Sequence, residues 1–173
     1  MFASLDLAAE PQLRLTELIA ALTRNAVDFV VIGGVAAQLH RLPMPATVDL
    51  DITPSRSPEN LTRLAKVFDE IDAALATVGE YGTWFPWHPI SNWSQYETLH
   101  LITKFGLLDL VFAPEGSEDG FNELIRESQN LQLGKHVVRV ISVSTWERLK
   151  IATKRDKDIF HLLLLAQHRE QRE

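Results

Sequence analysis

An apolar run that ends in two adjacent glycines lies near the start of this chain. Residues 28–34 read Asp-Phe-Val-Val-Ile-Gly-Gly. A short apolar run bounded by glycine is typical of a buried strand. Because glycine has no side chain, the backbone at Gly33 and Gly34 can approach a bulky anion that a side chain would exclude. A short helix predicted over residues 35–42 would add free backbone amides behind these glycines, so the run predicts a strand followed by an anion-binding turn.

Two carboxylates alternate with apolar residues in residues 47–52, which read Thr-Val-Asp-Leu-Asp-Ile. Residues two apart in a strand share a face, so Asp49 and Asp51 point together. Adjacent carboxylates repel each other unless a cation lies between them. Mg²⁺ suits such hard oxygen ligands and usually keeps phosphates and water as its other ligands. Either motif alone is common, but the two in this order predict a metal-dependent site for nucleoside triphosphates.

A third carboxylate interrupts a later apolar strand. Residues 98–104 alternate like a strand, and residues 107–112 read Leu-Leu-Asp-Leu-Val-Phe. A hairpin that turns at Phe105 and Gly106 would place Asp109 on the sheet that carries the earlier pair. A lone buried carboxylate is costly, so we expect Asp109 beside a cation, a metal or a ligand, with a structural salt bridge as the alternative.

Four segments together resemble a known family. They are residues 32–37 (Ile-Gly-Gly-Val-Ala-Ala), 47–52, 108–111 (Leu-Asp-Leu-Val) and 149–158 (Leu-Lys-Ile-Ala-Thr-Lys-Arg-Asp-Lys-Asp). In these segments the chain resembles the polymerase-beta-like nucleotidyltransferase superfamily, and within it the AbiEii and MenT-like toxin group. The resemblance runs from about Thr16 to Leu165. It implies an α/β (α+β) nucleotidyltransferase fold, with a small mixed β-sheet flanked by helices and a C-terminal helical portion.

A chain of 173 residues is long enough for one domain with a core, and one domain is expected over residues 1–173, with a catalytic sheet core to about residue 115 and a helical and strand part from about 116. The implied activity moves a nucleoside monophosphate from a triphosphate to an acceptor hydroxyl and releases pyrophosphate. Many family members have a serine near Val35 and a basic residue before the first acid, where this chain has Val48. Neither departure removes a metal ligand.

The family pattern implies a role for each matching residue. Asp49, Asp51 and Asp109 would hold Mg²⁺ or Mn²⁺, and Asp109 would also take the proton of the attacking hydroxyl. The remaining residues would serve the nucleotide. Backbone amides at Gly33 and Gly34 would approach the β- and γ-phosphates, Lys150 and Arg155 would pair with the triphosphate, and Lys157 and Asp158 would position those groups or the acceptor.

The sequence alone does not decide which molecule accepts the nucleotide. The toxin-group resemblance implies an RNA 3′ end, above all that of tRNA, and a cognate antitoxin protein as partner. A small molecule such as an aminoglycoside, or a protein, is also compatible. A non-catalytic nucleotide-binding module is the alternative from another class; the three carboxylates count against it, and the missing serine at Val35 counts for it.

Composition limits the partners. The formal net charge of −6 disfavours a general nucleic-acid binder, although residues 148–157 hold five basic side chains that would line the cleft or form a solvated helix face. There is no cysteine, which excludes disulfides and cysteine zinc sites. The first residues do not resemble a signal peptide and no apolar run is long enough to span a bilayer, so a cytoplasmic protein without a membrane partner is expected.

Further segments carry local predictions. Helices are expected over residues 11–25 and 57–75, a strand over 136–141, and a helix from the Ser144–Glu147 capping box through residue 166, with a frayed tail after it. The aromatic residues 81–96 are expected to cover the core rather than to stack a base. Structural roles are expected for His40, His88 and His100.

Overall fold

The structure, a computed structural model, describes residues 12–77 and 80–172. The helices are α1 (Leu15–Arg24), α2 (Gly33–Leu39), α3 (Pro58–Glu70), α4 (Gly120–Leu124), α5 (Val143–Thr153) and α6 (Asp156–Glu170), with a 3₁₀ helix η1 (Ile90–Asn92). The strands are β1 (Phe29–Ile32), β2 (Asp49–Pro54), β3 (Ala74–Thr77), β4 (Glu80–Thr83), β5 (Thr98–Thr103), β6 (Gly106–Val111), β7 (Ser128–Leu133) and β8 (His136–Ile141).

The strands form one mixed sheet in the order β4-β3-β5-β6-β2-β1-β8-β7. β2 lies between β1, with which it is antiparallel, and β6, with which it is parallel. Strands β7 and β8, from the C-terminal part of the chain, join this sheet through the parallel pairing of β8 with β1. The predicted mixed α/β architecture is therefore confirmed.

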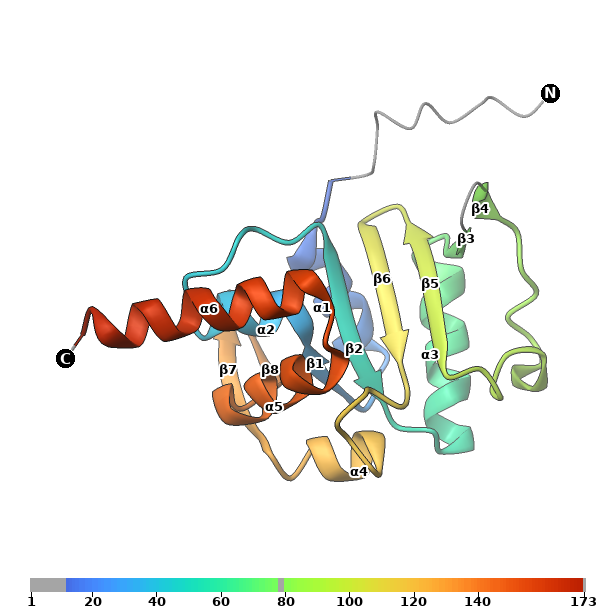
Figure 1. Cartoon of the computed structure of the whole chain (residues 1–173). Helices are drawn as coiled ribbons and strands as arrows, with labels where there is room; N and C mark the ends of the chain where they lie inside the picture. The colour runs from blue at the N-terminus through green and yellow to red at the C-terminus, as the bar shows by residue number, and fades with distance from the viewer. Residues whose placement is uncertain (1–11, 78–79, 173) are drawn as a thin grey trace.

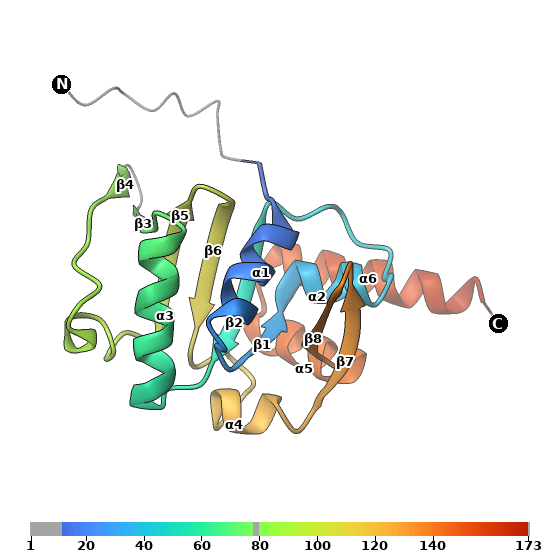
Figure 2. The same ribbon diagram turned by 180° about the vertical axis from the view of Figure 1, so that it is seen from behind.

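Helices lie on both faces of the sheet. Figure 2 shows α1 and α3 over one face, and Figure 1 shows α5 and α6 in front of the other. The second face is covered unevenly, because α5 and α6 lie towards β2, β1 and β8 and leave β5 and β6 open to view in Figure 1. Residues of β2 and β6 line a cleft on this face.

The core follows the alternation of the strands. Leu50 and Ile52 of β2 and Leu108 and Leu110 of β6 are fully buried, whereas Asp49, Asp51 and Asp109 between them are half-buried. Burying four large aliphatic side chains on one side, at about 1.5–3 kcal/mol each, fixes the register and turns the acids to the other face.

Part of the aromatic segment covers the core, as the sequence predicts. Trp87 and Trp93 are buried and pack on Phe68 of α3, with ring centroids 4.7 and 5.3 Å away. Trp84 and Tyr96 are exposed.

Several boundaries differ from the expectations. Helix α3 ends at Glu70 and the chain returns as β3, while the hairpin turns at Lys104 and Phe105, since Thr103 pairs with Gly106. Helix α5 begins one residue before Ser144, because the Ser142 side chain caps it by accepting from the Thr145 amide.

The predicted single C-terminal helix is two helices. Lys154 has a φ of +54°, in the left-handed region, so the chain breaks between α5 and α6. Helix α6 then continues to Glu170, so residues 168–170 are helical rather than frayed. None of the helices in the described ranges combines the length and hydrophobicity that a bilayer crossing requires.

Candidate active site

Three carboxylates converge on the open face of the sheet. Asp51 and Asp109 are directly paired in the parallel register of β2 and β6, and Asp49 lies two residues before Asp51 on the same face. One carboxylate oxygen from each residue lies within 4.8 Å of the others. The structure thus brings Asp109 together with two side chains from a segment that is far away in the sequence.

The two glycines stand directly against this cluster. A Cβ atom on Gly33 would overlap the Asp51 carboxylate, and one on Gly34 would lie 2.7 Å from Cβ of Thr47. Gly33 also has a φ of +65°, which glycine adopts readily. Close packing of the first two residues of α2 against Asp51 of β2 and against Thr47 is therefore possible only without side chains at these positions.

Neighbouring polar groups hold two of the carboxylates. The Thr47 hydroxyl donates to Oδ1 of Asp49 at 2.6 Å. Nδ1 of His100 lies 3.0 Å from Oδ1 of Asp109, and because a carboxylate only accepts, the ring nitrogen donates. Each of these bonds leaves another carboxylate oxygen for a ligand.

The electrostatics of the cluster favour a bound cation. Burial, together with the charges of Asp49 and Asp109, raises the pKa of Asp51 to about 7. Burial also raises the pKa of Asp109, and its hydrogen bond with His100 opposes this shift only in part. A divalent cation would offset the repulsion that disfavours the charged forms.

Cationic side chains from the α5–α6 junction face the acids. Lys150 Nζ and Arg155 Nε donate to the buried Asp158 carboxylate at 2.6 and 2.7 Å. Burial alone would raise the pKa of Asp158, but hydrogen bonds from Lys150, Thr153 and Arg155 outweigh it and lower the pKa to about 2. Asp158 therefore orients the two cations across the helix break.

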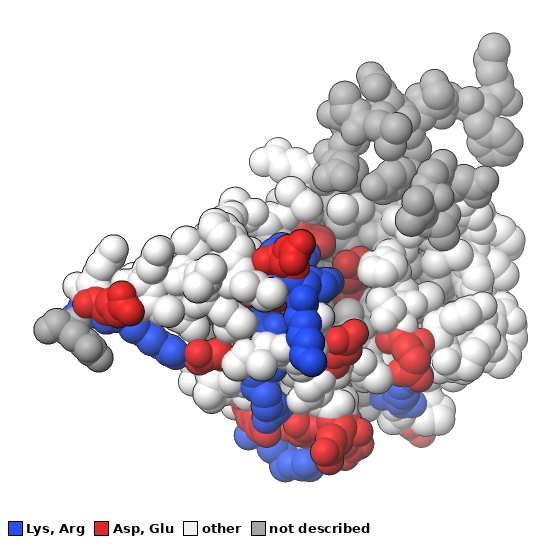
Figure 3. Space-filling view, viewed as in Figure 1, with Lys and Arg blue, Asp and Glu red and all other residues white. Residues whose placement is uncertain are grey.

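A cleft of about 650 Å³ contains most of the predicted site. Its lining includes Gly33, Gly34, Asp49, Asp51, Asp109, Lys150, Arg155 and Lys157. Asp158 does not line it but lies behind Lys150 and Arg155. Figure 3 shows basic and acidic side chains gathered at the centre of this face, in front of the sheet.

Three further lining residues were not predicted as site residues. Thr47 and His100 hold carboxylates, and Trp146 Nε1 donates to the Gly33 carbonyl at 3.0 Å. The sequence predicts a structural role for His100, and the hairpin pairing places it directly opposite Asp109, so the strand register is the signal that could have found it at this site. His40 has a structural contact, with Nε2 2.7 Å from the Ile141 carbonyl oxygen.

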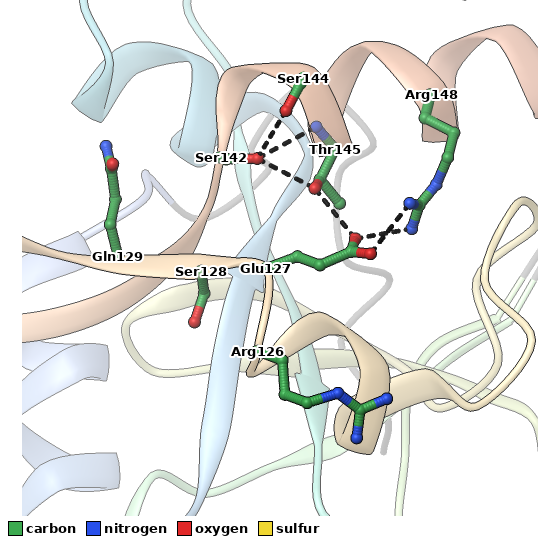
Figure 4. Close-up of a pocket in the computed structure, with 8 residues that line it drawn as sticks. All are labelled: Arg126, Glu127, Ser128, Gln129, Ser142, Ser144, Thr145 and Arg148. Atoms are coloured by element: carbon green, nitrogen blue, oxygen red, sulfur yellow. Dashed lines mark hydrogen bonds and ion pairs between the residues drawn. The ribbon is translucent and has the colours of Figure 1, made fainter.

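A second hollow, of about 570 Å³, lies at the start of α5 (Figure 4). Several of its groups are bonded to one another, since Glu127 accepts from Thr145 and pairs with Arg148 while Ser142 caps the helix. Glu127 is the only carboxylate among the residues that line it, so the hollow lacks a carboxylate cluster.

The comparisons with known proteins agree with this geometry at the level of the fold. No protein-family model matches the sequence, and no curated protein matches it. Among solved structures, TM1012 of Thermotoga maritima, a candidate nucleotidyltransferase, is 13% identical with a TM-score of 0.53, covering 89% of this chain and 91% of that one. The chain therefore has the nucleotidyltransferase fold that the sequence predicted.

Two structures of ANT(2″)-Ia are also similar. The crystal structure with adenylyl-2″-tobramycin has a TM-score of 0.45 at 13% identity and covers 92% of this chain and 97% of that one. The solution structure has a TM-score of 0.46 at 13% identity, with coverages of 91% and 90%.

Proposed function

We propose that this protein is a metal-dependent nucleotidyltransferase that moves a nucleoside monophosphate from a triphosphate to an acceptor hydroxyl. The observation that carries the proposal is the cluster of Asp49, Asp51 and Asp109, with mutually close oxygens in a cleft that also holds cations. The carboxylates suit a metal ion, and the cations of the same cleft suit the triphosphate that the ion accompanies.

The donor set fits Mg²⁺ or Mn²⁺. Three carboxylates supply hard oxygen ligands, and the raised pKa of Asp51 reflects a repulsion that a cation would relieve. When bound, the ion would neutralise phosphate charge and favour loss of pyrophosphate. Asp49, Asp51 and Asp109 would hold it.

The chain's own residues would bind and orient the reactants. Lys157, which makes no ion pair with another described residue, would meet the triphosphate directly, while Lys150 and Arg155 would do so in the orientation that Asp158 imposes. The turn at Gly33 and Gly34 would approach the β- and γ-phosphates through backbone amides.

Asp109 is the proposed general base. In the reaction, the acceptor oxygen bonds to the α-phosphorus, the bond from that phosphorus to the β-phosphate oxygen breaks, and pyrophosphate leaves. Asp109, which lines the cleft beside the other two carboxylates, would take the hydroxyl proton.

The proposed acceptor is an RNA 3′ end, above all that of tRNA, in a toxin restrained by a cognate antitoxin. The resemblance to the AbiEii and MenT-like group supports this choice. The exposed Arg155 and Lys157 at the cleft could hold one RNA end although the net charge of the chain is −6.

The test incubates purified protein with Mg²⁺, total tRNA and each labelled triphosphate in turn. Label should enter tRNA, and Asp51→Asn should lower the rate on the order of 10²–10³-fold, as for loss of one preorganised electrostatic group. Periodate-oxidised tRNA, which lacks the 3′ hydroxyl, is the acceptor control.

The outcomes separate the parts of the proposal. Label in oxidised tRNA would exclude the 3′ end as acceptor. Transfer only to a small molecule or a protein would reject RNA but keep the enzyme. Nucleotide binding that needs no metal, with no transfer to any acceptor, would favour the non-catalytic module.

A further inference from the structure

His100 contacts the third carboxylate of the cleft from the neighbouring strand. Its Nδ1 lies 3.0 Å from Oδ1 of Asp109, and the same imidazole lines the cleft. We propose that His100 is a positioning residue, whose ring N–H fixes one oxygen of Asp109 so that the other is presented to the metal ion. This inference rests on the proposed function, in which Asp109 is a metal ligand.

The sheet holds the two residues opposite each other. In the antiparallel pairing of β5 and β6, His100 faces Asp109 directly, and the flanking pairs are Leu99 with Leu110 and Leu101 with Leu108. These four leucines are buried. A one-residue slip would expose them and bury the polar pair, so the core fixes the position of the imidazole.

The hydrogen bond from His100 restrains the orientation of the Asp109 carboxylate. A carboxylate can rotate about its terminal bond, and only one oxygen of Asp109 has an imidazole partner. Carboxylates that bind metals are usually themselves hydrogen-bonded, and loss of such a partner typically costs about 10–100-fold in metal affinity. His100 is placed to be that partner.

The contact lies where a ligand would approach Asp109. The His100 side chain is 60% exposed, whereas that of Asp109 is 19% exposed, and both residues line the cleft. A histidine–aspartate contact away from the cleft serves for comparison. There His88 Nε2 approaches Asp69 at 2.8 Å, with side chains 52% and 60% exposed, and neither residue lines the cleft.

The experiment measures binding of Mn²⁺ alone, by electron paramagnetic resonance, to the full chain. His100→Leu removes the donor, whereas His100→Asn places an amide N–H near the position of Nδ1. His88→Leu removes the comparison contact with Asp69, away from the cleft. We expect His100→Leu to weaken Mn²⁺ binding about 10-fold or more, His100→Asn to stay within about threefold of the wild type, and His88→Leu to be unchanged.

Thermal unfolding of the metal-free variants checks that the effect is local. His100→Leu should melt close to the wild type, so that its weaker Mn²⁺ binding does not reflect unfolding. Asparagine keeps a hydrogen-bond donor at this position, so comparison of His100→Asn with His100→Leu tests whether Asp109 needs that donor.

Three results would overturn the inference: Mn²⁺ affinity of His100→Leu equal to the wild type, His100→Asn as weak as His100→Leu, or no Mn²⁺ binding by the wild type. The titration contains no nucleotide or acceptor, so it is independent of transfer. The expected Mn²⁺ pattern in a wild-type protein that transfers no nucleotide would support positioning while rejecting the proposed function.

Discussion

The carboxylate of Asp51 packs on the α-carbon of Gly33, at the end of the antiparallel pair that joins β1 to β2. A methyl group at residue 33 would overlap this carboxylate, and the φ of +65° there is one that other residues rarely adopt. The glycine therefore permits the position of a proposed metal ligand as well as the approach of an anion.

Gly33→Ala should displace Asp51 and lower nucleotidyl transfer by about 100-fold, since small misplacements of reacting groups cost rates of this size. Unfolding free energy should fall by about 1–3 kcal/mol because alanine is strained at this φ. Gly134→Ala is the matched control, because Gly134 has a φ of +57° but nothing within 4 Å of an added Cβ. Urea unfolding and transfer rates are measured for both variants. Equal transfer rates for Gly33→Ala and Gly134→Ala would contradict the packing argument.

Asp51→Asn should stabilise the metal-free protein at alkaline pH. The folded pKa of Asp51 is raised to about 7 by burial and by its acidic neighbours. A raised folded pKa means that the contribution of Asp51 is fully present below the unfolded pKa, near 4, and is lost as pH rises through about 7.

Relative to the wild type, the Asp51→Asn variant should therefore gain roughly 2–3 kcal/mol of unfolding free energy between pH 5 and pH 8, by linkage. Urea titrations with a chelator present measure the difference. Asp72→Asn, at a side chain that is 74% exposed, should show no such gain. A constant difference between Asp51→Asn and the wild type across this range would refute the electrostatic account.

Trp146→Phe should weaken nucleotide binding by removing the donor to the Gly33 carbonyl. Trp93→Phe removes a similar buried bond, from Nε1 to the Trp87 carbonyl at 2.9 Å, on the other side of the fold. Both variants should lose about 1–3 kcal/mol of unfolding free energy for an unsatisfied buried group. Only Trp146→Phe should raise the KM for triphosphate, and a similar KM change in both variants would count against a role in the glycine turn.

Asp158→Ala should destabilise the protein by about 3–5 kcal/mol, because it leaves Lys150 without its buried partner. The pKa of Asp158 is lowered to about 2, so its contribution is present above the unfolded pKa and is lost as pH falls from about 4 through about 2. Denaturant unfolding at pH 7 and pH 3 should show the difference shrinking in acid. Glu17→Gln, in the exposed pair with Arg14, should change the unfolding free energy little at either pH.

The period of two in β2 and the glycines after β1 made much of the site predictable. Those patterns depend on local sequence, and the structure places Asp49 and Asp51 on one face beside Gly33. The pairing of Asp51 with Asp109 needed the parallel contact of β2 and β6, which no local pattern contains.

Strand β7 and the break between α5 and α6 are not predicted by the sequence, because both depend on tertiary contacts. Strand β7 reads Ser-Gln-Asn-Leu-Gln-Leu, and this polar edge strand forms through its ladder with β8 rather than through an apolar alternation. The break between α5 and α6 falls at Lys154, without the glycine or proline that usually announces a helix end. There the contacts of Asp158 with Lys150 and Arg155 support the turn.

The cleft has an unfavourable charge balance for a free triphosphate. Four acids, Asp49, Asp51, Asp109 and Glu115, line it beside three cations, Lys150, Arg155 and Lys157. Asp158 already engages Lys150 and Arg155, so an incoming polyanion would find little uncompensated positive charge. In the proposed reaction, the divalent cation would therefore have to enter before the nucleotide or together with it, so the charges that line the cleft would set the order of addition.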